Sequence, residues 1–353
     1  MQQLMHDETS PGIDIVIPNY NGREMLQICL DSLAAQSYEN FEVIVVDNGS
    51  SDGSVELIHQ RYPDVQLIEL DQNLGFSAAV NHGIEQSTGE WVLLLNNDIE
   101  MDPHCLEKLA AATAGEPSYR MFALKMLSFH QRDVLDGAGD GVLRGGVGYR
   151  FGTMEADGAK YSLKREVFGA CAGAALYHRS LFEQIGLFDA DFFAYLEDVD
   201  FNLRAVRAGH CCCFVPQARV YHVGSATSGS KINALTVRLT TRNNIWVVCK
   251  NIPLLLFVQF LPAFLIYQLF WFLFILKKRH FISYIKGIGE ALPDILKMVR
   301  KTKQQANPNQ LSVQAFKQRI IDSEAQVIES IISRRTEQGK SSRLLSCYRR
   351  LFC

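Results

Sequence analysis

Four short apolar runs rich in β-branched residues, separated by helix-length stretches, occupy the first hundred residues of this 353-residue chain. The runs are Ile13–Pro18, Phe41–Asp47, Val65–Leu70 and Trp91–Asn96. The stretches between them lie at about 22–35, 53–60 and 76–87. Strands that alternate with helices in this way indicate βαβ units and a mostly parallel sheet with helices on both faces. The sequence therefore predicts an α/β fold.

Composition and charge narrow the class of protein. Hydrophobic residues make up 48% and charged residues 21%, which excludes intrinsic disorder and a fibrous fold. The formal net charge of −3 argues against a nucleic-acid-binding protein, which usually carries a strongly basic face. The nine cysteines are odd in number and irregularly spaced, so they fit free thiols in a reducing compartment better than a disulfide framework. Residues 1–12 lack the features of a secretory signal, so we expect a cytoplasmic location.

A long uncharged stretch, residues 251–276, follows the α/β part of the chain. As a helix it would reach about 39 Å, enough for a tilted crossing of a bilayer core of roughly 30 Å. Two prolines and two glutamines interrupt it and basic residues flank both ends, so an in-plane or re-entrant hairpin is as good an interpretation as a span. Residues 277–303 form a basic amphipathic segment suited to anionic lipid. We therefore expect membrane attachment through residues 251–303.

Polar side chains follow the first two strands of the predicted sheet. They are Pro18, Asn19 and Tyr20 after the first strand, and Asp47, Asn48 and Ser50 after the second. The carboxyl ends of parallel strands share one edge of an open α/β sheet, and ligands bind at that edge. A carboxylate there can accept hydrogen bonds from a base or a ribose, and a tyrosine can lie against a ring. The alternative is that these residues are simply turn formers.

A third strand end carries a candidate metal ligand. Asp98 follows the strand that ends at Asn96, and a carboxylate at that position can hold Mg²⁺ or Mn²⁺ against a diphosphate. Helix capping is the alternative role for this short segment. His222 follows a later strand and is a second candidate ligand, although a lone histidine is more often structural.

An acidic cluster opens the helix that we expect from Leu196 to Ala208. Glu197, Asp198 and Asp200 are three acids in four positions, beside apolar neighbours, which is a setting for a general base. Complementing the helix dipole explains Glu197 or Asp200, but it does not explain why all three cluster. Arg204, further along this helix, is either a phosphate contact or a salt-bridge partner of the cluster.

Seven sequence blocks, in this order and spacing, resemble the family 2 glycosyltransferases. The blocks are IVIPNYNG, VIVVDNGSSDGS, NLGFSAAVNHGI, WVLLLNND, GACAGAALYHRSLFEQIGLFD, FFAYLEDVDFNLRAVRAGH and VYHVGSATS, with the RNN at 242–244 as a small extension. The resemblance implies a nucleotide-sugar-binding, Rossmann-like mixed sheet of the glycosyltransferase A type. The implied organisation is an N-terminal tail (1–12), a catalytic domain (13–245) with a nucleotide-binding half (13–100) and an acceptor-binding half (101–245), the membrane-associated helical region (251–303) and a polar C-terminal tail (304–353).

The resemblance also implies a role for each candidate residue. Asp198 matches the catalytic base, Asp98 matches the last aspartate of the metal-binding DxD motif, and His222 matches a position that completes the metal site in some members. The implied nucleotide-binding residues are Pro18, Asn19, Tyr20, Asp47, Asn48, Ser50, Asn73, Asn81 and Asn97. The implied phosphate or acceptor contacts are Glu197, Arg204 and Arg242. The chain departs from the family at Asn96, the first position of the DxD motif, so a single carboxylate would hold the metal. The Gly-rich segment at 136–152, a mobile loop or a β excursion, is a candidate acceptor loop.

The implied activity is inverting transfer of a sugar from a nucleoside diphosphate to an acceptor hydroxyl, with Mg²⁺ or Mn²⁺ as cofactor. Chains with similar DNGSSDGS and NND blocks are often rhamnosyltransferases of bacterial surface polysaccharide assembly. The expected donor is therefore dTDP-L-rhamnose, with a UDP-hexose or a UDP-N-acetylhexosamine as alternatives. The expected acceptor is a lipid-linked saccharide at the cytoplasmic face of the bacterial inner membrane.

Two other classes of function are weighed against this one. A nucleotidyltransferase would need a basic, Gly-rich phosphate loop after the first strand, where PNYNGRE offers only Arg23. A non-catalytic membrane scaffold that binds sugar nucleotides would not need both Asp98 and Asp198.

Overall fold

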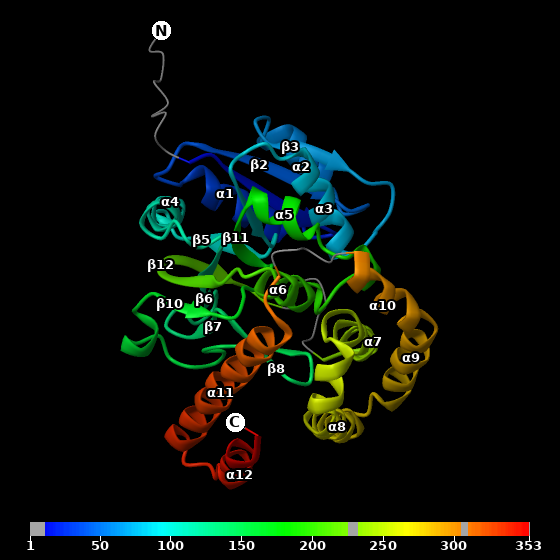
Figure 1. Cartoon of the computed structure of the whole chain (residues 1–353). Coiled ribbons are helices and arrows are strands. Elements are labelled where there is room, and N and C mark those ends of the chain that lie inside the picture. The colour runs from blue at the N-terminus through cyan, green and yellow to red at the C-terminus, as the bar shows by residue number, and fades with distance from the viewer. Residues whose placement is uncertain (1–10, 225–231, 305–309, 353) are drawn as a thin grey trace.

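A ten-stranded mixed sheet forms the centre of the molecule, in the order β10-β12-β6-β11-β4-β1-β2-β3, with β5 paired to β12 and β7 paired to β6 (Figure 1). A separate hairpin pairs β8 with β9. This computed structural model describes residues 11–224, 232–304 and 310–352, so most of the expected N-terminal tail lies outside the described residues.

The strands are β1 (Ile13–Asn19), β2 (Phe41–Asp47), β3 (Gln66–Glu69), β4 (Trp91–Leu95), β5 (Ile99–Met101), β6 (Met121–Ser128), β7 (Leu135–Ala138), β8 (Asp140–Leu143), β9 (Val147–Arg150), β10 (Arg165–Val167), β11 (Ala174–His178) and β12 (Cys212–His222). The helices are α1 (Arg23–Ala34), α2 (Ser54–Arg61), α3 (Phe76–Gln86), α4 (Cys105–Gly115), α5 (Arg179–Ile185), α6 (Glu197–Arg207), α7 (Ala234–Asn251), α8 (Leu254–Lys277), α9 (Phe281–Ala291), α10 (Ile295–Gln304), α11 (Val313–Glu337) and α12 (Arg343–Phe352). Short 3₁₀ helices lie at Ala159–Tyr161, Ala190–Phe192 and Leu292–Asp294.

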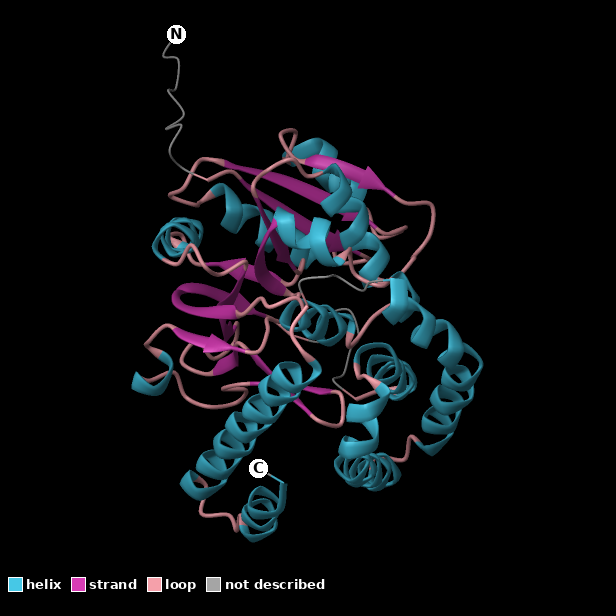
Figure 2. Cartoon of the chain, viewed as in Figure 1, coloured by secondary structure: helices cyan, strands magenta, loops and turns pink. Residues whose placement is uncertain are grey.

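The alternating pattern of the first hundred residues is confirmed. β1 pairs in parallel with β2 and β4, and β2 pairs in parallel with β3. Side chains along each strand alternate between two cores, because successive residues of a strand point to opposite faces. Val16 and Leu94 face the core that holds α3 and α5, whereas Ile15 and Leu93 face α1 and α4. The whole sheet is mixed because β11 runs antiparallel between β4 and β6, and helices cover both faces (Figure 2).

The Gly-rich segment at 136–152 is a β excursion and contains β8, β9 and most of β7. Helix α11 packs against the β8–β9 hairpin and supplies its polar contacts. Ser323 Oγ accepts a hydrogen bond of 2.8 Å from the N–H of Val142, and the buried carboxylate of Glu324 pairs with the buried guanidinium of Arg144. Much of the segment that the sequence predicts as a polar tail therefore packs on the β8–β9 hairpin, within residues 101–245.

Helices α7 to α10 gather on one side of the sheet and share a core with α6 (Figure 1). That core joins Val199 and Leu203 of α6 to Trp246 of α7 and Phe260 of α8. The domain boundary expected at residue 245 lies inside α7. Among the described residues, α8 is the one helix that is long and apolar enough, by length and composition, to cross a membrane.

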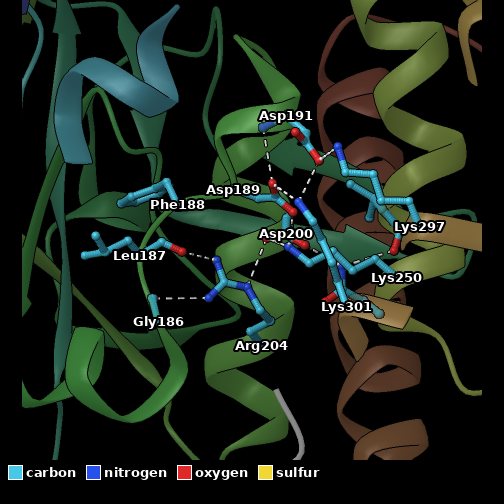
Figure 3. A network of polar contacts seen from close by, with 12 residues as sticks. Gly186, Leu187, Phe188, Asp189, Asp191, Asp200, Arg204, Lys250, Lys297 and Lys301 are labelled. Carbon is cyan, nitrogen blue, oxygen red and sulfur yellow. Dashed lines mark hydrogen bonds and ion pairs between the residues drawn. The ribbon is translucent and has the colours of Figure 1, made fainter. Parts of the chain in front are cut away.

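A network of salt bridges, buried at Lys250 and partly exposed at Lys297, attaches these helices to α6 and to the segment that precedes it (Figure 3). It joins three lysines, Lys250, Lys297 and Lys301, to three aspartates, Asp189, Asp191 and Asp200. The Nζ of Lys250 is fully buried and lies 2.8 Å from an oxygen of Asp189 and 2.8 Å from an oxygen of Asp200. Two cations of the expected lipid-binding segment, Lys297 and Lys301, therefore bind the α/β part of the protein.

Candidate active site

The carboxyl ends of β1, β2 and β4 meet at one edge of the sheet, because these strands run in parallel. Asn19 lies opposite Asp47 in the β1–β2 pair, and its Nδ2 donates to Asp47 Oδ1 at 2.9 Å and to Ser50 Oγ at 3.2 Å. Asn97, just past β4, donates from Nδ2 to Asn19 Oδ1 at 2.7 Å. Gly22 leaves room for this contact, because a Cβ there would collide with the Asn97 amide. Four predicted nucleotide-binding residues thus form one hydrogen-bonded cluster.

A second group of amides extends this cluster toward the loop before α3. Asn48 Nδ2 donates to Asn73 Oδ1 at 3.1 Å, and Asn48 Oδ1 accepts from the N–H of Leu74 at 2.8 Å. Pro18 lies within β1, and the exposed ring of Tyr20 follows the end of that strand. The structure therefore brings together the ends of β1, β2 and β4 and the loop after β3, as expected for a site at this edge.

Three of the other predicted residues hold loops. Both ends of the Asn81 amide bind the backbone of Phe188, at 2.7 and 3.0 Å. Arg204 is buried, forms a 3.0 Å ion pair with Asp200 and donates to three carbonyl groups at and after the end of α5. The alternative given for Arg204, a salt bridge to the acidic cluster, is therefore what the structure contains. Arg242 donates to two carbonyl groups of the short 3₁₀ helix that precedes α6.

The Asp98 and His222 side chains lie side by side, because His222 at the end of β12 pairs with Ile99 of β5. Asp98 Oδ1 is 3.4 Å from His222 Nε2, and this buried oxygen has no hydrogen-bond partner among the described residues. The other ring nitrogen, Nδ1, lies 2.8 Å from Asp136 Oδ2. Burial alone would lower the pKa of His222, but Asp136 and Asp98 raise it to about 9. A buried carboxylate oxygen without a hydrogen-bond partner among the described residues, beside an imidazole that a second carboxylate orients, fits a divalent cation that takes the place of the imidazole proton.

Asp198 lies near the same edge of the sheet, beside the residues that come just before β11. Ala174, the first residue of β11, pairs with Leu95, the last residue of β4, so the residues just before β11 lie next to the β4 end. Cys171 is one of these residues. The ligand atoms of Cys171, Asp198 and Asp140, from β8, all lie within 4.8 Å of one another.

Burial and crowding of negative charge dominate the electrostatics at the start of α6. Burial raises the pKa of Asp198, although the nearby positive charge of Arg150 opposes this shift. Burial and the charge of Asp198 raise the pKa of Glu197 to about 8. The pKa of Asp140 rises to about 7, first because of burial and, against the effect of Arg150, because Asp198 is near. Glu197 and Asp140 therefore titrate near neutral pH, and the pKa of Asp198 lies above the usual range of an aspartate, which favours a general base.

The chain enters α6 through a strained segment. Phe193, Tyr195 and Leu196 have φ angles of 64°, 70° and 65°, in the left-handed region. Side chains other than glycine are held there at a cost of about 1–3 kcal/mol each, and such residues cluster at active sites. The Asn243 side chain of α7 lies 2.7–3.0 Å from three carbonyl oxygens of residues 192–195. The RNN sequence at 242–244 thus fixes the segment that orients Asp198.

Sequence reasoning missed several residues of this site. They are Asp136, Asp140, Arg150, Cys171 and Asn243. The available signal was the set of charged residues among the glycines of 136–152, together with the RNN. Cys171 is one of seven cysteines that the structure describes as free thiols.

Comparison with known proteins assigns the chain to a family. The profile described as Glycosyl transferase family 2 matches residues 14–186. The chain is 30% identical over 246 residues to the N-acetylglucosaminyl-diphospho-decaprenol L-rhamnosyltransferase of Mycobacterium tuberculosis, over 62% of this chain and 78% of that protein. The chain belongs to glycosyltransferase family 2. It is therefore a glycosyltransferase, and it is similar to rhamnosyltransferases, as the sequence blocks predicted.

A further relative and two solved structures are also similar to this chain. A PGL/p-HBAD biosynthesis glycosyltransferase of Mycobacterium bovis is 31% identical over 55% of this chain and 70% of that protein. The structure of GalNAc-T7 with UDP, GalNAc and Mn²⁺ aligns with a TM-score of 0.65 at 15% identity, over 91% of this chain and 58% of that one. The structure of S. aureus TarS 1-349 with UDP-GlcNAc aligns with a TM-score of 0.53 at 17% identity, over 94% of this chain and 93% of that one. At these identities the two structures establish the fold, and that fold is the expected glycosyltransferase A type.

Proposed function

We propose that this family 2 glycosyltransferase moves a sugar, with inversion, from a nucleoside diphosphate to a hydroxyl of a lipid-linked saccharide. The observation that carries the proposal is the meeting of three groups at one sheet edge. These groups are the Asp47 cluster, the Asp98–His222 pair and the Asp198 carboxylate. The first group suits the nucleoside of a sugar donor, the second suits its diphosphate, and the third suits the acceptor hydroxyl.

Asp198 acts as the general base. It takes the proton of the acceptor hydroxyl while that oxygen attacks the anomeric carbon from the face opposite the diphosphate. The bond from the anomeric carbon to the diphosphate breaks, and its electron pair leaves on the phosphate oxygen. General base catalysis of this kind contributes roughly 10²–10⁴-fold. The raised pKa of Asp198 makes it a stronger base than an ordinary aspartate.

Asp98 and His222 would hold the divalent cation, Mg²⁺ or Mn²⁺. Their fit rests on the buried Asp98 oxygen without a hydrogen-bond partner among the described residues. When bound, the cation stabilises the negative charge that grows on the leaving diphosphate. GalNAc-T7 and the Pyrobaculum calidifontis mannosyltransferase, which share the fold, were each solved with Mn²⁺, and this supports a metal here.

The proposed donor is dTDP-L-rhamnose, and the proposed acceptor is a polyprenyl-diphosphate saccharide. Both follow from the likeness to the mycobacterial enzyme, whose name specifies an L-rhamnosyl transfer and an N-acetylglucosaminyl-diphospho-decaprenol. The Asp47, Asn48 and Ser50 cluster would bind the nucleoside, with the exposed Tyr20 ring against it.

We further propose that α8 lies in the plane of the cytoplasmic membrane surface and does not cross it. Leu256, Phe260, Ala263 and Ile275 form a buried stripe along the helix. Gln268 and Trp271 of α8 also donate hydrogen bonds to α7 side chains, at 2.7 and 3.0 Å. A crossing would draw α7 into the bilayer with its three charged residues, Arg238, Arg242 and Lys250, at high cost.

Exposed apolar side chains lie on α8, α9 and α10 and at the short helix between α9 and α10, and we call this set the lipid face. Its exposed side chains are Leu254, Leu255, Val258, Leu265, Leu269, Phe270, Leu273, Phe274, Leu276, Phe281, Ile282, Ile285, Leu292, Leu296 and Val299. Exposed cations on the same helices and their connections are Lys277, Lys278, Arg279, Lys286 and Arg300. An apolar face beside basic residues suits an anionic leaflet, where a lipid-linked acceptor also resides.

A transfer assay tests the function. We expect rhamnose transfer from dTDP-L-rhamnose to polyprenyl-diphospho-N-acetylglucosamine, with UDP-glucose and UDP-N-acetylglucosamine run in parallel. Asp198→Asn should lower the rate at least about 100-fold while dTDP still raises the melting temperature. The matched control is Asp64→Asn, at an exposed aspartate, which should leave the rate unchanged. Full activity of Asp198→Asn, or no transfer from any donor, would contradict the proposal.

A further inference from the structure

One arginine contacts several groups of the site that sequence reasoning did not assign. Arg150, the last residue of β9, has Nη1 3.5 Å from Asp136 Oδ2 and Nε 3.6 Å from Asp140 Oδ1. Its Nη2 donates to the sulfur of Cys171. Asp140, Arg150 and Cys171 also line one small pocket. The guanidinium therefore sits among two carboxylates and a thiol that come from three different segments.

Asp140 and Cys171 connect Arg150 to the base. Both lie within 4.8 Å of the Asp198 carboxylate. Asp140 is buried, and its Oδ1 has no hydrogen-bond partner among the described residues, so its main electrostatic compensation is the nearby guanidinium. Cys171 is neutral, because burial raises its pKa above the usual range of a thiol.

Asp136 connects the same arginine to the proposed metal pair. Its Oδ2 binds His222 Nδ1 at 2.8 Å, and His222 Nε2 lies 3.4 Å from Asp98. A continuous set of polar contacts thus runs from Asp98 through His222 and Asp136 to Arg150, and on to the surroundings of Asp198.

We propose that Arg150 is the positioning residue of the reaction: its guanidinium keeps the Asp198 carboxylate ionised and fixes it relative to the Asp98–His222 pair. This inference rests on the proposed function, since it takes Asp198 as the base. Without the arginine, two buried carboxylates would lie next to Asp198 with no compensating charge. In part of the molecules Asp198 would then already be protonated, and it could not take the proton of the acceptor hydroxyl.

A metal ion held by Asp140, Cys171 and Asp198 is the competing interpretation of this cluster. The guanidinium already supplies a positive charge there, and its contact with the Cys171 sulfur takes the atom that a metal would need. The cluster is therefore better explained as a base with an organic cation than as a second metal site.

Several titratable groups face Asp198. They are Asp140 from β8, Arg150 from β9, Cys171 before β11, Tyr177 of β11 and Glu197 of α6. Burial keeps Cys171 and Tyr177 neutral, so Arg150 and the two carboxyl groups decide the charge around the base.

The test is the pH profile of kcat/KM for the acceptor, measured with the full-length protein and the substrates named above. The acidic limb of this profile reports the pKa of the base. Arg150→Gln should move this limb by about 1–3 units toward higher pH, and it should lower kcat at pH 7 at least about tenfold. Stabilisation by dTDP should persist. Asp140→Asn removes a neighbouring negative charge, so it should move the same limb toward lower pH. Arg150→Lys keeps the charge and should restore most of the limb position.

Arg319→Gln is the matched control, because Arg319 also pairs with a carboxylate, Glu166, but at the surface. Its pH profile should be that of the wild type. An unmoved limb in Arg150→Gln, or shifts of the same sign in Arg150→Gln and Asp140→Asn, would overturn the inference. If Arg150→Gln does not fold, an Asp140→Asn limb that stays in place or rises would overturn it. An active Asp198→Asn refutes the proposed function itself, whereas an inactive Asp198→Asn with an unmoved Arg150→Gln limb refutes the role of Arg150 alone.

Discussion

Replacing Lys250 with methionine removes a buried cation from between two carboxylates. The Nζ of Lys250 is fully buried and lies 2.8 Å from both Asp189 and Asp200, which are themselves buried (Figure 3). Breaking a buried ion pair costs about 3–5 kcal/mol, because the remaining charges stay desolvated. Asp200 retains Arg204 and Asp189 retains Lys301, so we expect the lower end, about 3 kcal/mol.

The assay is thermal unfolding of detergent-purified protein at pH 7. A chain of this length has an unfolding entropy of about 0.7 kcal/mol/K, so the melting temperature of Lys250→Met should fall by about 4 °C. The control is Lys297→Met in the same network, since Lys297 is half exposed and lies 2.6 Å from Asp191. An exposed pair contributes about 0–1 kcal/mol, so its melting temperature should fall by no more than about 1.5 °C. Equal shifts in the two variants, or an unchanged Lys250→Met, would refute the reasoning.

Four further predictions follow from single contacts. Burial alone would raise the pKa of Asp189, but its lysine partners lower it to about 2. The contribution of Asp189 to stability is therefore present above about pH 4 and is lost as the pH falls toward 2. The urea concentration at the midpoint of unfolding should vary less over that pH range for Asp189→Asn than for the wild type. Asn243→Ala should lower kcat at least about tenfold without changing the affinity for dTDP, because the segment before Asp198 loses its support. Leu269→Glu on the lipid face should weaken sedimentation with anionic liposomes at least about tenfold, whereas Leu163→Glu, also exposed, should not. In the wild type, dTDP should raise the melting temperature more with Mn²⁺ than with EDTA. In Asp98→Asn, the rise with dTDP should be the same with Mn²⁺ and with EDTA.

The parts of the fold that local patterns determine were predictable from the sequence. The β-branched runs of β1, β2 and β4 and the turn residues after them indicated both the sheet and the edge that carries Asp47, Asn97 and Asp98. The acidic cluster and a strand-end histidine already made Asp198 and His222 candidates, and the family likeness then assigned them the roles of base and metal ligand.

Contacts between distant segments were not predictable in the same way. Arg204 has the same sequence context whether it binds a phosphate or Asp200, and only the packing of α6 against the loop after α5 decides between them. The hairpin that carries Asp140 and Arg150 is a Gly-rich segment in the sequence. Its hydrogen-bond partners on α11 lie some 180 residues later in the chain. Likewise, the positive charges of Lys297 and Lys301 indicated lipid, but their partners are aspartates that lie more than 100 residues earlier in the chain.

Helix α10 belongs to two environments at once. Leu296 and Val299 are exposed on the lipid face, while Lys297 and Lys301 hold the aspartates that lead into α6. Under the proposed membrane attachment, we expect a displacement of α10 to reach the strained residues before Asp198 through the salt bridges of Lys297 and Lys301. Under the proposed membrane attachment, the catalytic rate should respond to lipid composition even with a water-soluble acceptor, so that docking and activation are one event.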